Sequence, residues 1–223
     1  METTFEITMP NIITMTDVAT ALEQAATSHA KALNLDFPRM LHEFGALWMI
    51  VRSRLCLTRM PKNELRVKTW MRKPTAAVSY RDFALFDGEE EIGYAVQSWV
   101  LADANERSLI NMKKVDILWS TPTVQPEREI SLKRLHVPPL PTVGEWTVTQ
   151  AETDINGHVN NIRYIAHAER FAPIGALCLD ISYERECFPG ETLQIQAENG
   201  YVCGIKSDGT VSFRAHFYKG ESL

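Results

Sequence analysis

The chain has 223 residues, of which 45% are hydrophobic and 23% charged, an ordinary composition for a globular protein with a buried core. Its formal net charge of -5 argues against nucleic-acid binding, because phosphate contacts need a dense basic surface. No stretch approaches the roughly 18 consecutive apolar residues of a membrane span. The acidic N-terminus shows no signal-peptide pattern, so we expect a cytoplasmic protein.

The first half is predicted to contain one long helix followed by an antiparallel sheet. Apolar residues recur at helical spacing from Val18 to Leu33, and Thr14 with Asp17 resembles a capping box at the helix start. We expect a break in the pattern at Pro38. Segments rich in Val, Trp, Tyr and Thr then predict four strands, over residues 47–58, 64–72, 79–86 and 92–102.

The periodic pattern fades in the middle of the chain. Five prolines fall in this stretch, at Pro122, Pro126, Pro138, Pro139 and Pro141. Such a composition is typical of a linker that crosses a surface. We therefore expect an N-terminal unit over residues 1–112, a linker over 113–143 and a C-terminal unit over 144–223.

The second half repeats the order of the first. Its strands are predicted at 145–149, 177–187, 192–198, 201–206 and 210–218, with a helix at 161–171 after the first of them. Echoes such as Ala46-Leu47-Trp48 and Ala176-Leu177-Cys178 indicate an internal duplication. The sequence therefore predicts an α+β fold of the double hot-dog type, in which each of two units wraps an antiparallel sheet around a central helix.

The run Asp154-Ile155-Asn156-Gly157-His158-Val159-Asn160-Asn161 has no counterpart in the first half. Asp154, Asn156 and His158 are spaced by two, so an extended segment would project all three to one side. Gly157 permits a sharp turn, and one of the two asparagines at the end can cap the following helix. A polar helix-entry loop with Asx turns is the simpler interpretation. A carboxylate, an amide and a histidine brought together are also the groups of acid–base and nucleophilic chemistry.

This run and the following Ile162-Arg163-Tyr164-Ile165 resemble the signature of the acyl-acyl carrier protein thioesterase family, which includes plant plastid and bacterial enzymes. A second family element, an acidic residue followed by cysteine, is matched by Glu186-Cys187, and the similarity extends to residues 65–70 and 98–101. The resemblance implies a tandem hot-dog fold and hydrolysis of fatty acyl thioesters on acyl carrier protein, which would terminate fatty acid synthesis. We expect no cofactor and no metal.

The catalytic residues that the resemblance implies are Asp154, Asn156, His158, Glu186 and Cys187, and two mechanisms stay open. In the first, Glu186 and His158 activate a water or Asp154 attacks the thioester, while Asn156 orients the carboxylates. In the second, Cys187 is the nucleophile and His158 its base. We favour the first, since a thiol only exchanges one thioester for another. Glu186 and Cys187 would also face opposite sides of a predicted strand.

The acyl chain is expected in the N-terminal unit, whose apolar helix and strands can form a dry slot. Ordinary core packing is the alternative for each candidate lining residue. The candidates are Leu41, Phe44, Leu47, Trp48, Met49, Trp70 and Trp99.

A local basic cluster that includes Arg66, Arg72 and Lys73 is the candidate docking surface for the acidic acyl carrier protein that the resemblance implies. Solvated strand faces are the alternative interpretation of these charges. The duplication is compatible with a monomeric pseudo-dimer or with a homodimer.

Two alternative functions and the state of the four cysteines also follow from the sequence. A hot-dog acyl-CoA thioesterase or a non-catalytic acyl-binding sensor would use the same fold. A hot-dog hydratase is disfavoured, because its Asp-x-Asn-Pro-x-His spacing is absent. The four cysteines are widely spaced without a CxxC pair, so buried free thiols are expected at Cys56, Cys178, Cys187 and Cys203.

Overall fold

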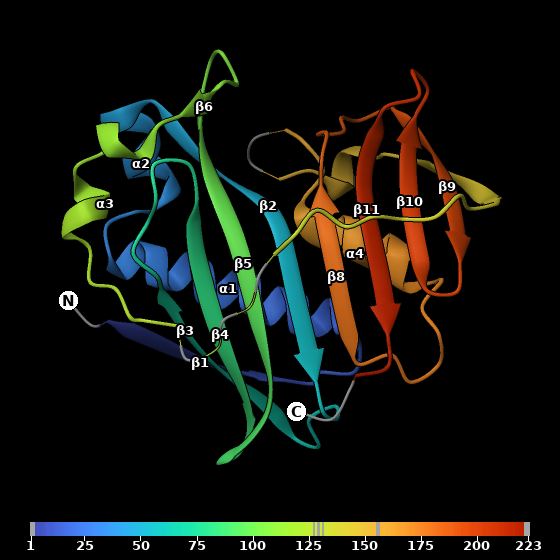
Figure 1. Cartoon of the computed structure of the whole chain (residues 1–223), viewed down its shortest axis with the longest axis horizontal. Helices are drawn as coiled ribbons and strands as arrows, with labels where there is room; N and C mark the ends of the chain where they lie inside the picture. Colours follow the sequence, from blue (N-terminus) through green and yellow to red (C-terminus); the bar gives the residue numbers. More distant parts are fainter. Residues whose placement is uncertain (1–2, 127, 129, 131, 155–156, 221–223) are drawn as a thin grey trace.

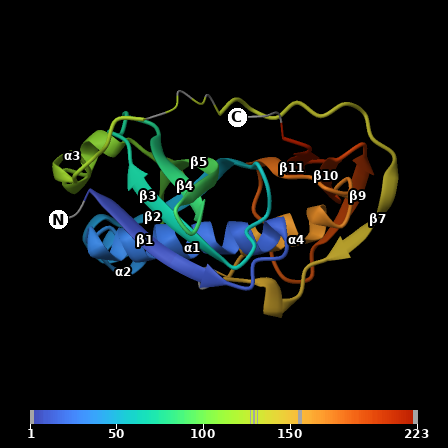
Figure 2. The ribbon, with the colours of Figure 1, turned by 90° about the horizontal axis from the view of Figure 1, so that it is seen from below.

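One continuous antiparallel sheet of eleven strands is present in the computed structural model, which describes residues 3–126, 128, 130, 132–154 and 157–220 (Figure 1). Two helices, one from each half, lie against its concave face (Figure 2). None of the helices in these residues is long and apolar enough to span a membrane.

The first half contains the predicted long helix and the four strands predicted after it, together with a strand before the helix and a second helix, which were not predicted. Its elements are β1 (Thr4–Pro10), α1 (Met15–Ala32), α2 (Phe37–Phe44), β2 (Ala46–Leu57), β3 (Glu64–Met71), β4 (Ser79–Asp87), β5 (Glu90–Asp103) and β6 (Leu109–Ile110). The capping box at the start of α1 is confirmed, because Asp17 N–H donates to the Thr14 hydroxyl and the Asp17 carboxylate accepts from Thr14 N–H. The apolar face of α1 is buried against the sheet, as its spacing predicts.

The second half repeats these elements. They are β7 (Thr142–Thr147), a 3-10 turn η2 (Gln150–Glu152), α4 (Asn161–Glu169), β8 (Cys178–Tyr183), β9 (Thr192–Glu198), β10 (Tyr201–Lys206) and β11 (Val211–Tyr218). The strand order is β1-β3-β4-β5-β2-β8-β11-β10-β9-β7, so each half mirrors the other about the central pair β2 and β8. The duplicated hot-dog arrangement predicted from the sequence is confirmed.

Two predicted boundaries are wrong. Pro38 does not end a helical region; it lies in the first turn of α2, where its missing N–H has no intrahelical partner to lose. The strand predicted over residues 177–187 ends at Tyr183, so Glu186 and Cys187 lie in the loop between β8 and β9. Strand alternation therefore cannot separate Glu186 from Cys187. The two side chains nevertheless have different neighbours.

The cysteine expectation is wrong for two of the four residues. Cys56 on β2 and Cys178 on β8 are directly opposed in the strand register and form a disulfide between the two halves. Their separation of 122 residues along the chain gives no local signal of this contact. Cys187 and Cys203 are buried free thiols, as predicted.

The segment between the two halves has two parts. The 3-10 turn η1 (Met112–Lys114) and α3 (Ile117–Ser120) pack onto the first half, where Met112, Val115 and Leu118 join one hydrophobic cluster. The chain then crosses the outer face of the sheet, on the side away from α1 and α4, to reach β7 (Figure 2). The crossing segment is held by a hydrogen bond from Arg52 to the Leu132 carbonyl.

Candidate active site

The loop that carries the histidine is a tight reversal rather than an extended segment. Asp154 N–H donates to the His158 carbonyl at 2.8 Å, and Gly157 N–H donates back to the Asp154 carbonyl at 3.1 Å. Gly157 has φ +79°, the left-handed region that a side chain disfavours. The expectation of an extended projection is therefore wrong for Asp154 and His158. Asn156 lies outside the described residues.

Asn160 ends this loop and begins α4. Its side-chain oxygen accepts from Ile162 N–H at 2.7 Å, which confirms the predicted helix cap. The other end of the same amide donates to the Glu23 carboxylate at 3.1 Å. Burial raises the pKa of Glu23, and this hydrogen bond partly opposes the rise. A residue of α1 thus reaches the loop of His158 in the other half, a contact that the sequence analysis missed.

His158 is nearly buried between two carboxylates that come from different segments. Its Nδ1 lies 4.0 Å from Asp154 Oδ1, and its Nε2 lies 3.6 Å from Glu186 Oε1. Nε2 is buried and has no hydrogen-bond partner among the described residues. Both gaps exceed a direct hydrogen bond, but the gap beside Nε2 suits a water or substrate oxygen that contacts both groups.

Glu186 is approached from the first half as well. Arg107 Nη1, from the turn between β5 and β6, lies 3.7 Å from Glu186 Oε1. Arg107 adopts φ 56°, uncommon for a non-glycine residue. Sequence analysis missed Arg107, because nothing in its local pattern distinguishes it from other charged turn residues. The structure brings together Asp154, His158 and Glu186 as predicted and adds Arg107.

Cys187 points away from this group. Its Sγ lies 3.1 Å from Ser212 Oγ in the core, and its carbonyl accepts from Val159 N–H at 3.0 Å. Burial raises the pKa of the Cys187 thiol, although hydrogen bonds with Ser212 and Tyr164 partly oppose it. A buried, protonated thiol is a poor nucleophile.

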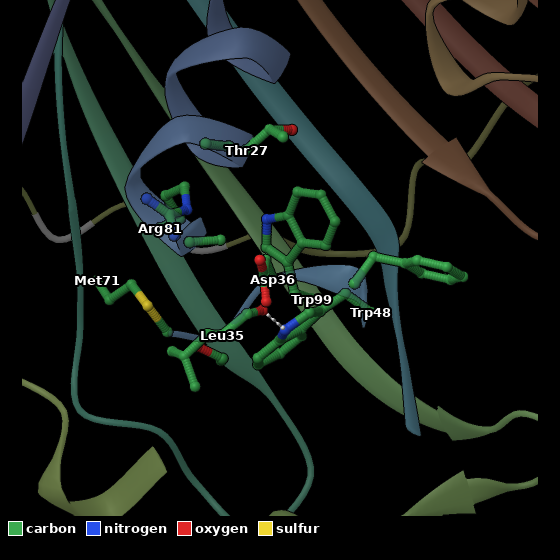
Figure 3. A pocket seen from close by; sticks show the side chains of 11 residues that line it. Thr27, Leu35, Asp36, Trp48, Met71, Arg81 and Trp99 are labelled. Atoms are coloured by element: carbon green, nitrogen blue, oxygen red, sulfur yellow. Dashed lines mark hydrogen bonds between the residues drawn. The ribbon is translucent and has the colours of Figure 1, made fainter. Parts of the chain in front are cut away.

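A cavity of about 170 Å³ lies beside α1 in the first half, and we call it the first-half cavity (Figure 3). Trp48 and Trp99, two of the predicted acyl-binding residues, line it. Trp48 is fixed by a hydrogen bond from its Nε1 to the Leu35 carbonyl at 3.1 Å. The full lining is Ala26, Thr27, Ala30, Leu35, Asp36, Phe37, Trp48, Met71, Ser79, Arg81 and Trp99.

The other predicted acyl-binding residues do not line this cavity. Trp70 faces the opposite side of the sheet, where it lines a smaller pocket with Asp82 and Arg128. Leu41 and Phe44 belong to α2, and Leu47 and Met49 lie near the start of β2. None of the four lines the cavity.

A second, smaller cavity connects the two halves, and we call it the junction cavity. It is lined by α1, the sheet and the start of α4, including Glu23, Asn161 and Tyr183. Trp99 lines both cavities. Together the linings of the two cavities include residues from the start of α4 to the start of α2.

The predicted docking residues differ in their surroundings. Arg72 is held by Asp82 through two hydrogen bonds of 2.6 Å. Arg66 donates to Glu6 at 3.3 Å and stacks over Phe86, while Lys73 is exposed. Arg66 and Lys73 are therefore the members of this cluster that can meet a partner at little cost to the fold.

Two family models match the chain. The model described as acyl-ACP thioesterase N-terminal domain matches residues 3–118, and the one described as acyl-ACP thioesterase C-terminal domain matches residues 140–217. An oleoyl-acyl carrier protein thioesterase from Coriandrum sativum is 23% identical over 209 residues, which are 82% of this chain and 57% of that protein. The chain thus spans about half the length of this relative.

Solved structures share the fold. An acyl-ACP thioesterase from Bacteroides thetaiotaomicron superposes with a TM-score of 0.83 at 24% identity, over 96% of each chain. The 12:0-ACP thioesterase from Umbellularia californica superposes with a TM-score of 0.79 at 18% identity, over 97% of each chain. At these identities the likeness establishes the double hot-dog fold and leaves the chemistry to the residues of this chain.

Proposed function

Since the chain belongs to the acyl-ACP thioesterase family, we propose that it hydrolyses fatty acyl-acyl carrier protein to a free fatty acid and the carrier, terminating fatty acid synthesis. The observation that carries the proposal is His158 between Asp154 and Glu186, beside the start of α4. A histidine flanked by carboxylates can take a proton from water and return it to a leaving group.

In the proposed mechanism a water lies beside His158 Nε2 and Glu186 Oε1, which are 3.6 Å apart, and is within hydrogen-bond distance of both. His158 Nε2 takes a proton from this water as the water oxygen attacks the thioester carbonyl, and Glu186 holds the water in place. The positive end of the α4 helix dipole stabilises the oxyanion. The protonated base then gives its proton to the departing thiolate. Direct attack by Asp154, with Asn156 orienting the carboxylates, is the second route.

The acyl chain is proposed to run from the catalytic loop through the junction cavity into the first-half cavity, past Trp99 and Trp48. Burial of each methylene contributes about 0.8 kcal/mol, so the depth of this path would set chain-length preference. The docking surface is proposed at Arg66 and Lys73, where an acidic carrier would be attracted.

The test is hydrolysis of acyl carrier protein and CoA thioesters of graded chain length, measured as free fatty acid released. We expect release, with higher kcat/KM for the carrier-bound substrates. No release from any thioester would refute the proposal. Arg66→Glu with Lys73→Glu should raise KM for the carrier-bound substrate several-fold at low salt but leave the CoA thioester unchanged. Equal effects on both substrates would remove the docking surface.

The carrier distinguishes the alternatives. A preference for CoA thioesters would favour an acyl-CoA thioesterase, and binding without turnover would favour an acyl-binding sensor. A monomeric pseudo-dimer or homodimer and a cytoplasmic location stay predictions. The Cys56–Cys178 disulfide speaks against a cytoplasmic location, because most cytoplasmic thiols are kept reduced.

A further inference from the structure

Arg81 occupies a position on β4 that belongs to the core. Strand alternation places it on the same inward face as Phe83 and Leu85, which are 2% and 0% exposed. Arg81 itself is only 6% exposed. Burial lowers its pKa to about 10, so it still carries its charge at neutral pH. A buried cation is costly unless something compensates it.

The contacts of Arg81 compensate that charge only in part. Its Nη1 contacts His29 Nδ1 at 2.8 Å and Thr69 Oγ1 at 3.2 Å. Among the described residues, Arg81 forms no ion pair with a carboxylate, and both of its side-chain hydrogen bonds are made through Nη1. The guanidinium therefore presents unused donors while it lines the first-half cavity (Figure 3).

Two further polar atoms near Arg81 are also without partners in the described part of the chain. Gln97 lies directly opposite Arg81 in the β4–β5 register, and its Oε1 is buried and unpaired. Trp99 lies opposite Ser79 in the same register, and its Nε1 is buried and unpaired. Gln97 lines the junction cavity and Trp99 lines both cavities. Donors from Arg81 and Trp99 and an acceptor from Gln97 thus lie on neighbouring positions of β4 and β5, in the linings of the two cavities.

We infer that the preferred substrate carries a hydroxyl group within its acyl chain, held by Arg81, Gln97 and Trp99; this rests on the proposed function. A hydroxyl accepts from Arg81 or Trp99 and donates to Gln97 Oε1, which a plain methylene cannot do. A carboxylate could accept from the same donors but has no proton for Gln97 Oε1. The apolar part of the first-half cavity lining, which includes Leu35, Trp48 and Met71, holds the chain beyond the hydroxyl.

The test compares thioesters of one chain length that are unsubstituted, hydroxylated at successive positions, or ended by a carboxylate. We expect at least about a tenfold gain in kcat/KM for one hydroxyl position, since a site built to bond a substrate hydroxyl rejects the analogue without it. Equal values for the plain and hydroxylated chains would overturn the inference, as would preference for the terminal carboxylate.

Variants separate recognition from folding. Arg81→Met and Trp99→Phe should each abolish most of the preference, measured as the ratio of kcat/KM for the hydroxylated chain to that for the plain chain. Arg128→Met is the matched control, because Arg128 lies outside both cavities and pairs with Glu91 on the surface. A preference that survives both cavity variants would overturn the inference. If Arg81→Met fails to fold, Trp99→Phe alone decides the outcome.

A binding measurement keeps this inference distinct from the proposed function. Free hydroxylated and plain fatty acids are titrated into the wild-type protein and followed by tryptophan fluorescence, since Trp48 and Trp99 line the first-half cavity. Tighter binding of the hydroxylated acid supports the inference even if no thioester is hydrolysed. Equal affinity overturns it even if hydrolysis is found.

Discussion

His158 lies between Asp154 of its own loop and Glu186 of a loop that follows β8, at 4.0 and 3.6 Å from its two ring nitrogens. A carboxylate on each side can orient the ring and stabilise the imidazolium that forms when it accepts a proton. Cys187 has the opposite surroundings, since its Sγ contacts Ser212 in the core and burial raises its pKa. At the scale of residues, the carboxylate route therefore has the better geometry.

Substitution at the site separates the two routes. His158→Ala and Glu186→Gln should each lower kcat by about 10²- to 10⁴-fold, the usual contribution of a general base. Cys187→Ser keeps a hydroxyl where Sγ meets Ser212, and we expect it to keep most of the activity. Steady-state kinetics, with circular dichroism to verify folding, makes the measurement. An inactive but folded Cys187→Ser variant would restore the thiol as nucleophile.

At the scale of elements, Glu152 ties together the segments on which the catalytic loop is built. Its carboxylate accepts from Thr149 N–H at 2.8 Å, from Trp146 Nε1 at 3.2 Å, and pairs with His167 Nε2 at 2.8 Å. Burial opposes the charge, but these hydrogen bonds outweigh it and lower the pKa of Glu152 to about 2. One carboxylate thus joins β7, η2 and α4.

The stabilisation by Glu152 should depend on pH. Because its pKa is depressed in the folded state, the contribution is complete above the unfolded value of about 4.3 and is lost as pH falls toward 2. We expect Glu152→Gln to lower the free energy of unfolding at pH 7 by about 1–3 kcal/mol. The difference from wild type should shrink between pH 5 and pH 3.

Urea unfolding at several pH values measures this effect. Glu145→Gln is the matched control, since Glu145 is an exposed residue of β7, and it should leave the free energy of unfolding nearly unchanged. A constant difference between Glu152→Gln and wild type across this pH range would contradict the role of the charge.

At the scale of the whole molecule, both halves contribute residues to the candidate active site. The central strands β2 and β8 pair across the halves. The Glu169 carboxylate at the end of α4 accepts from the backbone N–H groups of Met15 and Thr16, at 2.7 and 3.0 Å, and so caps α1. Glu23 and Arg107 of the first half also reach the catalytic loop and Glu186. Residues of both halves therefore surround His158 and Glu186.

Arg107 of the first half is expected to act as a positioning residue for Glu186 of the second half. Arg107→Ala should lower kcat about tenfold with little change in KM, because Glu186 loses the cation 3.7 Å away that helps to fix its orientation. Arg107→Lys, which keeps the charge, should recover part of the loss. Arg39→Ala, an exposed residue of α2, serves as the control. Equal losses in Arg107→Ala and Arg107→Lys, or a change in KM alone, would contradict the assignment.

The sequence was enough to predict α1, the four strands that follow it, the duplication and the helix caps, because these depend on local patterns. Alternating strands, helical spacing in α1, the Thr14 cap and the Asn160 cap each involve residues a few positions apart. The errors at Pro38 and at the end of β8 fall on boundaries, where local signals for two structures compete.

Only the tertiary structure decided which half supplies each part of the site and which residues line the cavities. Arg107 meets Glu186, and Cys56 meets Cys178, because β2 pairs with β8 and places distant segments at the same seam. In the sequence, Arg81 looks like any charged residue of a strand. Its burial follows only from the curvature of the sheet, which places this face of β4 toward α1. Such contacts are set by strand order and register across the whole sheet, which no short stretch of sequence encodes.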